Sequence, residues 1–104
     1  MKRASIRRQR CPIHPGALLR KDVLPAMKVS VSEAAREMGV SRQTLHRLLN
    51  ESIGVSPEME LRLGKFCGNG PTLWLRMQQA VDLWRAEERL RDEIERIPTH
   101  KPAA

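Results

Sequence analysis

The chain has 104 residues, of which 40% are hydrophobic, so it is long enough for one domain with a small core. Its formal net charge of +7 favours a polyanionic partner, with nucleic acid the first candidate. No apolar run reaches the ~18 residues of a membrane span, and residues 1–16 lack the apolar stretch of a secretory signal. We therefore expect a cytoplasmic protein with no membrane partner.

Basic residues are concentrated at the N-terminus, where the first ten residues carry five of them and no acid. The rest of the chain is nearly balanced in charge. We expect residues 1–12 to form a flexible basic arm in which Arg7, Arg8 and Arg10 contact the DNA backbone. The alternative is a solvated tail.

The two cysteines do not form a disulfide framework. Cys11 and His14 have the spacing of a metal-ligand pair, but one such pair cannot close a tetrahedral zinc site. We therefore expect no metal and no cofactor.

All segments with a clear hydrophobic period are helical, and the strand pattern of alternating residues with hairpin turns is absent. His14-Pro15 predicts the start of a first helix, because proline is preorganised for the first helical position. This helix is expected over residues 15–24, with Pro25 as its end. Its buried residues are expected to be Ala17, Leu18 and Val23.

Residues 30–50 predict two short helices joined by a tight turn. Ser30 can cap the first helix, with Glu33 completing a capping box, and Ser41 can cap the second. Gly39 lies at the corner, where the chain needs a left-handed backbone that glycine tolerates. The residues expected to face inward are Ala34, Ala35, Met38, Val40, Leu45, Leu48 and Leu49. Such a pair is the helix-turn-helix of DNA-binding proteins.

The outer face of the second of these helices carries donors suited to base edges and phosphates. The residues on this face, which we predict to bind DNA, are Arg42, Gln43, Thr44, His46, Arg47 and Asn50. An ordinary helix pair in a small bundle is the alternative interpretation.

Two further helices are predicted. Ser56-Pro57 indicates a helix over residues 57–66 that buries Met59, Leu63 and Phe66, with the run 67–70 as its end and Cys67 as a small core residue. Gly70-Pro71 indicates the longest helix, over residues 71–97, which Pro98 ends. We expect residues 13–97 to form the helix-turn-helix domain and residues 98–104 a flexible tail.

The longest helix carries two apolar stripes. The first is expected to cover the N-terminal helices and consists of Leu73, Met77, Ala80, Val81 and Trp84, with Trp74 at its edge. The second consists of Leu83, Leu90, Ile94 and Ile97. We predict that the second stripe is a dimer seam or a docking surface, the alternative being scattered apolar residues at a helix end.

Four sequence blocks carry a family resemblance. They are Ile13-His14-Pro15-Gly16, Val40-Ser41-Arg42-Gln43-Thr44-Leu45, the block Ser56-Pro57-Glu58-Met59-Glu60-Leu61-Arg62-Leu63, and Trp74-Leu75-x-Met77-Gln78-x-Ala80-x-Asp82-Leu83-Trp84. In these blocks, over residues 12–88, the chain resembles the XRE or lambda-repressor-like regulators. Within them it is similar to the HigA-type antitoxins, also named virulence-associated protein I.

The resemblance implies an all-α, five-helix DNA-binding domain that dimerises and binds operator DNA ahead of its own operon. It implies that Arg42, Gln43 and Arg47 meet base edges and that Ser41 contacts phosphate. Where the fold often has a phosphate-binding Gln at the start of its second helix, this chain has Val31, so Ser32 or the helix amides would replace that contact.

The resemblance also implies a toxin partner, a HigB or RelE-like ribonuclease that cuts mRNA on ribosomes. Since such toxins are basic, the toxin would dock on a local acidic surface of the longest helix. The alternative docking site is the flank of the first helix near Asp22. The acidic candidates are Glu87, Glu88, Asp92, Glu93 and Glu95.

Three other functions compete with an autoregulating antitoxin. A stand-alone regulator of the same fold differs only in having no toxin. An enzyme is disfavoured because no nucleophile–base pair or phosphate loop is present and the chain has only three histidines. A purely structural dimerisation module would leave the polar face of residues 42–50 unexplained.

Overall fold

The computed structural model describes residues 10–103, which form helices and contain no strand. Segments α1 (Pro15–Leu18), η2 (Leu19–Val23) and α2 (Leu24–Met27) follow one another without a break and make one helical run, in which η2 is a π-helical turn. Four separate helices follow: α3 (Val31–Met38), α4 (Arg42–Leu49), α5 (Pro57–Cys67) and α6 (Thr72–Glu95). The expected all-α, five-helix class is confirmed.

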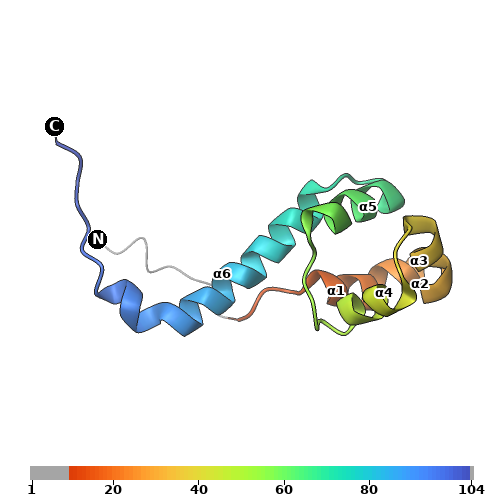
Figure 1. Cartoon of the computed structure of the whole chain (residues 1–104), viewed down its shortest axis with the longest axis horizontal. Coiled ribbons are helices and arrows are strands. Elements are labelled where there is room, and N and C mark those ends of the chain that lie inside the picture. The colour runs from red at the N-terminus through yellow and green to blue at the C-terminus, as the bar shows by residue number, and fades with distance from the viewer. Residues whose placement is uncertain (1–9, 104) are drawn as a thin grey trace.

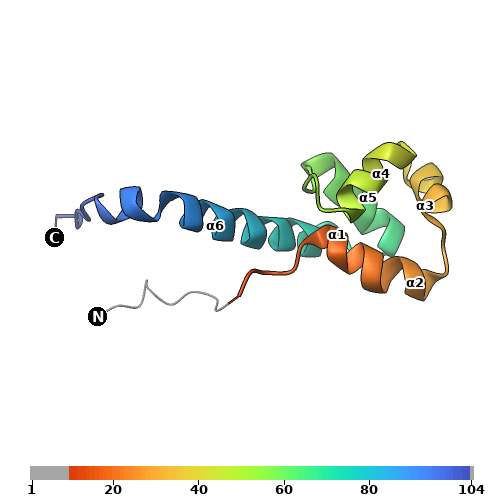
Figure 2. The same cartoon turned by 90° about the horizontal axis from the view of Figure 1, so that it is seen from below.

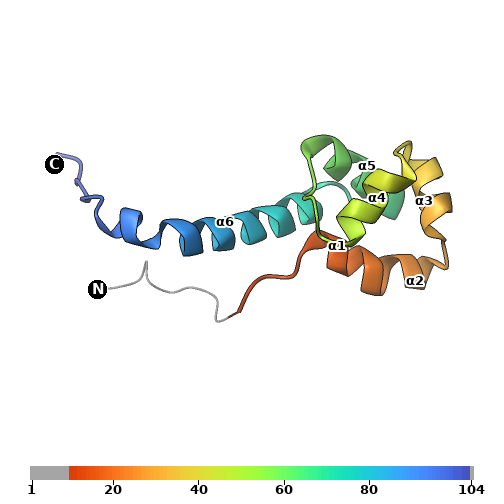
Figure 3. The same cartoon turned by 60° about the horizontal axis from the view of Figure 1, so that its bottom comes forward.

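The helices preceding α6 gather around its N-terminal half, and its C-terminal half projects away from them (Figure 1). The molecule is accordingly elongated, with extents of 55 × 27 × 21 Å. All three views place α3 at the end of the molecule opposite the projecting half of α6 (Figures 2 and 3). Residues 98–103 follow without regular secondary structure. Within residues 10–103, every helix is too short or too polar to cross a membrane.

The expected end of the first helix at Pro25 is wrong, because the helical run continues to Met27. In the π-helical turn, the N–H of Leu24 donates to the carbonyl of Leu19, five residues earlier. This turn is wider than an α-turn, so the proline ring escapes the clash with the carbonyl four residues back that normally breaks a helix. The run ends at Lys28, which has a left-handed φ of 57°.

The core confirms the residues expected to face inward from α3 and α4. Six of the seven are buried, and Val40 is half-buried against them. Leu19 and Leu63 join this cluster with no exposed surface, so the first helical run and α5 close it from either side.

The expected first stripe of α6 is confirmed in part, since Val81 is buried and Met77, Ala80 and Trp84 are half-buried. Trp74, placed at the edge of the stripe, is fully buried, whereas Leu73 is 42% exposed. The buried face is centred on Trp74, Gln78 and Val81. A polar residue in the middle of this face broke the apolar pattern and shifted the expected stripe.

The first turn of α1 lies unusually close to the last turn of α4. A Cβ atom added at Gly16 would stand 1.8 Å from the carbonyl oxygen of Leu48. Only glycine permits this approach, because the obstructing atom belongs to the backbone and cannot rotate away.

We predict that Gly16→Ala lowers the free energy of unfolding by about 3 kcal/mol, since the added methyl group must separate two packed helices. Urea denaturation followed by circular dichroism measures this loss. Gly70→Ala is the matched control, because Gly70 has a φ of +77° but nothing within 4 Å of an added Cβ; it should cost about 1 kcal/mol through backbone strain alone. Equal losses in the two variants would contradict the steric argument.

Candidate nucleic-acid interface

Helices α3 and α4 form the expected helix-turn-helix. The Ser30 hydroxyl oxygen accepts a hydrogen bond from the N–H of Glu33 at 3.1 Å, and the Ser41 hydroxyl oxygen accepts one from the N–H of Thr44 at 3.0 Å. Gly39 ends α3 with a φ of 74°. Each helix end therefore has the residue that its backbone requires.

The face of α4 that points away from the core carries most of the predicted DNA-binding side chains. Those exposed in the chain are Arg42, Gln43, His46, Arg47 and Asn50. Thr44 is half-buried, and its hydroxyl oxygen accepts a hydrogen bond from the Ser41 hydroxyl at 2.8 Å. The Ser41–Thr44 pair thus closes the start of α4, and Arg42 and Gln43 lie beside it on the first turn.

The remaining predicted DNA contacts lie elsewhere on the molecule. Ser32 is exposed on the first turn of α3. Arg10 is exposed at the start of the described chain, and the arm residues Arg7 and Arg8 lie outside the described residues.

Arg20, which the sequence did not single out, holds the C-terminal end of α4. Its guanidinium donates a hydrogen bond to the carbonyl of Leu49 and lies 3.4 Å from the carboxylate of Glu51. With the close contact at Gly16, these interactions fix one end of α4 to the first helical run. The opposite end, which carries Arg42 and Gln43, remains exposed.

Two more side chains join the helix-turn-helix to α5 and α6. The Arg62 guanidinium donates to the carbonyl of Met38 at 2.7 Å, at the end of α3. The buried Gln78 side chain accepts from the N–H of Val55 at 2.7 Å and donates to the Asp82 carboxylate at 2.9 Å. The sequence placed Gln78 and Asp82 in a family motif but did not predict what they bind. In the structure, Gln78 fastens the loop after α4 to α6.

His14 is a buried histidine that caps α1. Its Nδ1 accepts a hydrogen bond from the N–H of Gly16 at 2.9 Å, and its Nε2 has no hydrogen-bond partner within the described part of the chain. Burial lowers the pKa of His14 below its ordinary value of 6.5, while Glu51 opposes this shift. Protonation would place a charge in a buried site and convert the capping acceptor into a donor facing another donor.

We predict that folding stability declines as the pH falls below about 6.5, the ordinary histidine pKa. The pKa of His14 is lowered in the folded state, so its stabilising contribution is complete above the unfolded value and is lost as protons bind preferentially to the unfolded chain. Urea unfolding between pH 7.5 and 5 measures the slope. His14→Asn keeps a capping oxygen but does not titrate, so it should flatten the profile. An unchanged slope in this variant would assign the pH dependence to other groups.

Both cysteines are free thiols, with Cys11 exposed and Cys67 half-buried. Residues 10–103 contain no group of three or more His, Cys, Asp or Glu side chains that could hold a metal ion. Cys67 packs against the core, and burial raises the pKa of its thiol. This placement confirms the interpretation of Cys67 as a small core residue, since a raised pKa disfavours the reactive thiolate.

The fold and the exposed face of α4 define a helix-turn-helix protein, and comparisons with known proteins narrow this class. Antitoxin HigA-1 of Vibrio cholerae serotype O1 is 34% identical to the chain over 85 residues, which cover 82% of this chain and 80% of the relative. No protein-family model matches the chain.

Solved structures agree with this relationship. Antitoxin GraA in complex with its operator superimposes with a TM-score of 0.81 and 37% identity, covering 94% of this chain and 99% of that one. Pseudomonas aeruginosa antitoxin HigA with the higBA promoter gives a TM-score of 0.81 and 30% identity, covering 86% and 99%. The chain belongs to the HigA-type family of helix-turn-helix antitoxins, as its sequence blocks predicted.

Proposed function

We propose that this protein is a HigA-type antitoxin that represses its own operon by binding operator DNA and neutralises a ribonuclease toxin of the HigB or RelE kind. The observation that carries the DNA-binding part of the proposal is the exposed first turn of α4. The C-terminal end of the same helix is held by Arg20 and lies against Gly16. Relatives solved with an operator or a promoter support it. The proposal includes no catalytic activity and no cofactor, and it places the protein in the cytoplasm, where both partners occur.

In this proposal α4 enters the major groove with its N-terminal turn leading. Arg42 and Gln43 then reach base edges, for which arginine–guanine and glutamine–adenine are the natural bidentate pairs. Arg47 follows a turn later, with His46 and Asn50 beside it. Ser41, Ser32 and Arg10 contribute backbone contacts, which position the protein without reading sequence.

We predict that Arg42→Ala and Gln43→Ala each reduce operator binding by about 1–3 kcal/mol, because each removes a bidentate contact to a base. Fluorescence anisotropy with the operator and with a random duplex at one salt concentration measures the specificity ratio. Arg89→Ala, at an exposed arginine on α6, is the matched control for lost charge and should leave that ratio unchanged. If the Arg42 and Gln43 variants lose affinity equally on both duplexes, these residues do not read sequence.

The operator-bound form is proposed to be a two-fold dimer. One recognition helix reads few base pairs, whereas two helices spaced by a turn of DNA read a longer, palindromic site. The apolar side chains available for a seam lie on the projecting half of α6 and beyond: Ile94 is 54% exposed, Ile97 is 61% exposed, and Leu90 is half-buried.

The toxin surface is proposed to lie on another face of α6. Glu88, Asp92 and Glu95 follow at spacings of four and three residues, and Glu88 comes seven residues after the buried Val81. These carboxylates therefore lie on the same side of α6 as the buried Val81, but beyond the part of α6 that packs against the other helices. Charge complementarity would steer a basic toxin onto these carboxylates.

We predict that co-expression with a basic toxin of about one hundred residues encoded beside this gene rescues growth and yields a co-purifying complex. The double variant Glu88→Lys/Asp92→Lys should slow association about tenfold, because electrostatic steering acts mainly on the rate of encounter. Stopped-flow mixing measures this rate, and Glu93→Lys, on a different face of the same helix, is the control. A normal rate in the double variant would place the toxin surface elsewhere.

The second candidate function is a stand-alone transcriptional regulator of the same fold. The rescue experiment decides between the two. Sequence-specific DNA binding without rescue and without a complex would reject the antitoxin function and retain the regulator.

A further inference from the structure

His14 lies at the contact that places α4. A Cβ atom added at Gly16 would stand 1.8 Å from the carbonyl oxygen of Leu48 and 3.2 Å from Nδ1 of His14. The imidazole is therefore a direct neighbour of the point where the first turn of α1 meets the last turn of α4. Only 4% of His14 is exposed, so a charge on this ring has little access to water.

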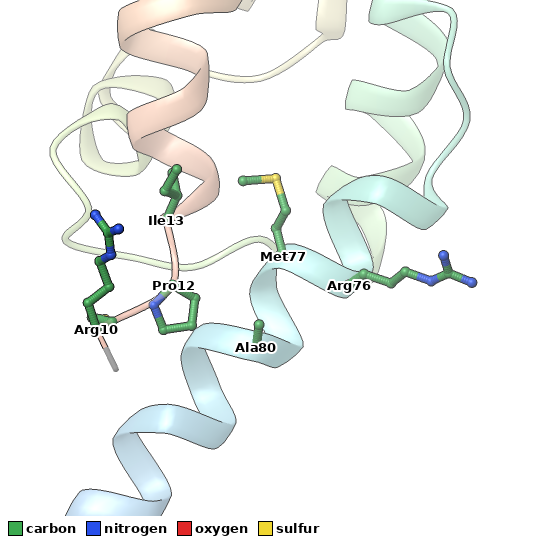
Figure 4. A pocket seen from close by; sticks show the side chains of 7 residues that line it. Arg10, Pro12, Ile13, Arg76, Met77 and Ala80 are labelled. Atoms are coloured by element: carbon green, nitrogen blue, oxygen red, sulfur yellow. The ribbon is translucent and has the colours of Figure 1, made fainter. Parts of the chain in front are cut away.

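The chain also packs against α6 immediately before His14. Pro12 and Ile13 lie next to Met77 and Ala80 of α6, with which they line one groove (Figure 4). His14 follows Ile13 and precedes α1. The histidine thus lies in the short segment where α6, α1 and the end of α4 come together.

The hydrogen bonding of His14 suits only the neutral ring. Its Nδ1 accepts the N–H of Gly16 at 2.9 Å, so the proton of the neutral ring is on Nε2. Protonation at Nδ1 would remove this acceptor and turn a second donor toward the Gly16 donor. Nε2 is buried without a hydrogen-bond partner in the part of the chain that the structure describes, so no hydrogen bond there stabilises a positive ring.

Four charged side chains act on His14 from the elements packed around it. They are Glu51 from the loop after α4, Arg85 and Asp82 from α6, and Arg20 from the first helical run. Burial is the main cause that lowers the pKa of His14; Arg85 and Arg20 lower it further, and Glu51 and Asp82 raise it. The two carboxylates are thus the groups that a positive imidazole would attract.

Both carboxylates already hold the loop after α4. Glu51 lies 3.4 Å from the Arg20 guanidinium. Asp82 accepts a hydrogen bond at 2.9 Å from the Gln78 side chain, which in turn accepts the N–H of Val55 at 2.7 Å. A positive imidazole attracts Glu51 and Asp82 and repels Arg20, so it competes with these ties at both ends of the loop.

We propose that His14 makes operator binding sensitive to acid: protonation of its ring releases the C-terminal end of α4, so that this helix loses its fixed position and its affinity for DNA. The proposal rests on the DNA binding of the proposed function and adds a form of regulation to it. Only the fastened form of α4 presents Arg42 and Gln43 in a fixed position, so the apparent affinity falls with the fraction of the chain in that form.

The other two histidines of the chain are removed for the test. His46 lies on the predicted DNA-binding face, where a proton would strengthen binding to phosphates and oppose the expected effect. The background variant His46→Gln/His100→Gln leaves His14 as the only histidine. His14→Asn in this background is the matched variant that does not titrate, because asparagine keeps a capping oxygen, and His14→Ser is a second one should the first fail to fold.

Hydrogen exchange between pH 7.5 and 5 follows the end of α4. The N–H groups of Asn50, Glu51 and Ser52 each donate to a carbonyl of α4 at 2.9 Å. After correction for the intrinsic exchange rate, their protection should fall by up to about tenfold per pH unit below about 6.5, because the open form binds one more proton than the closed form. Amides within α5 and the N-terminal half of α6 should keep their protection.

Operator affinity is measured over the same range by fluorescence anisotropy. The dissociation constant should rise at least about fivefold between pH 7.5 and 5.5 in the background variant, and less than about twofold once His14→Asn is added. Circular dichroism at each pH checks that the helices remain.

Three outcomes would overturn the proposal. Protection at the end of α4 that does not change with pH, or an equal loss of affinity with His14→Asn, would exclude His14 as the responsible group. A parallel loss of protection in α5 and α6 would indicate general acid unfolding rather than release of α4. The proposed function is tested separately at pH 7.5, where absence of sequence-specific binding would reject that function, whereas normal binding without the pH dependence would reject only this proposal.

Discussion

The contact between the first turn of α1 and the last turn of α4 determines where α4 lies. Each residue of His14-Pro15-Gly16 has a separate part in it. His14 caps the helix through Nδ1, Pro15 starts it, and Gly16 leaves space for the carbonyl of Leu48. The positive end of one helix thereby meets the negative end of the other, an arrangement that the helix dipoles favour. Arg20 adds a cation at the same end of α4.

The same constraint leaves the N-terminal end of α4, which we propose to read bases, exposed. All the strong tethers of α4 lie at its C-terminal end or in its buried face. At the N-terminal end, the Ser41 hydroxyl donates to the hydroxyl oxygen of Thr44 and accepts a hydrogen bond from the N–H of Thr44. Arg42 and Gln43 thus project from a helix that is rigidly placed, and a rigidly placed side chain discriminates bases better than a loosely held one.

Local signals made most of the helical frame predictable, and long-range contacts account for what was missed. Ser30, Gly39 and Ser41 define their helix ends through hydrogen bonds to residues three or four positions away, so the sequence is sufficient to find them. Arg20, Arg62 and Gln78 act on partners that are 29, 24 and 23 residues distant. Hydrophobic periodicity does not predict such long-range partners. It also left the polar Gln78 out of the expected buried face of α6. Pro25 was misread because the π-helical turn that accommodates it has no recognised sequence pattern.

The two halves of α6 have different surroundings (Figure 1). The side with Trp74, Gln78 and Val81 packs against the other helices. Further along α6, the same side carries Glu88, Asp92 and Glu95. The proposed toxin surface therefore begins where the packing of α6 against the other helices ends, so a toxin bound there would not have to displace those helices. The exposed Ile94 lies on the same projecting half, where it stays available to a second copy in the proposed dimer.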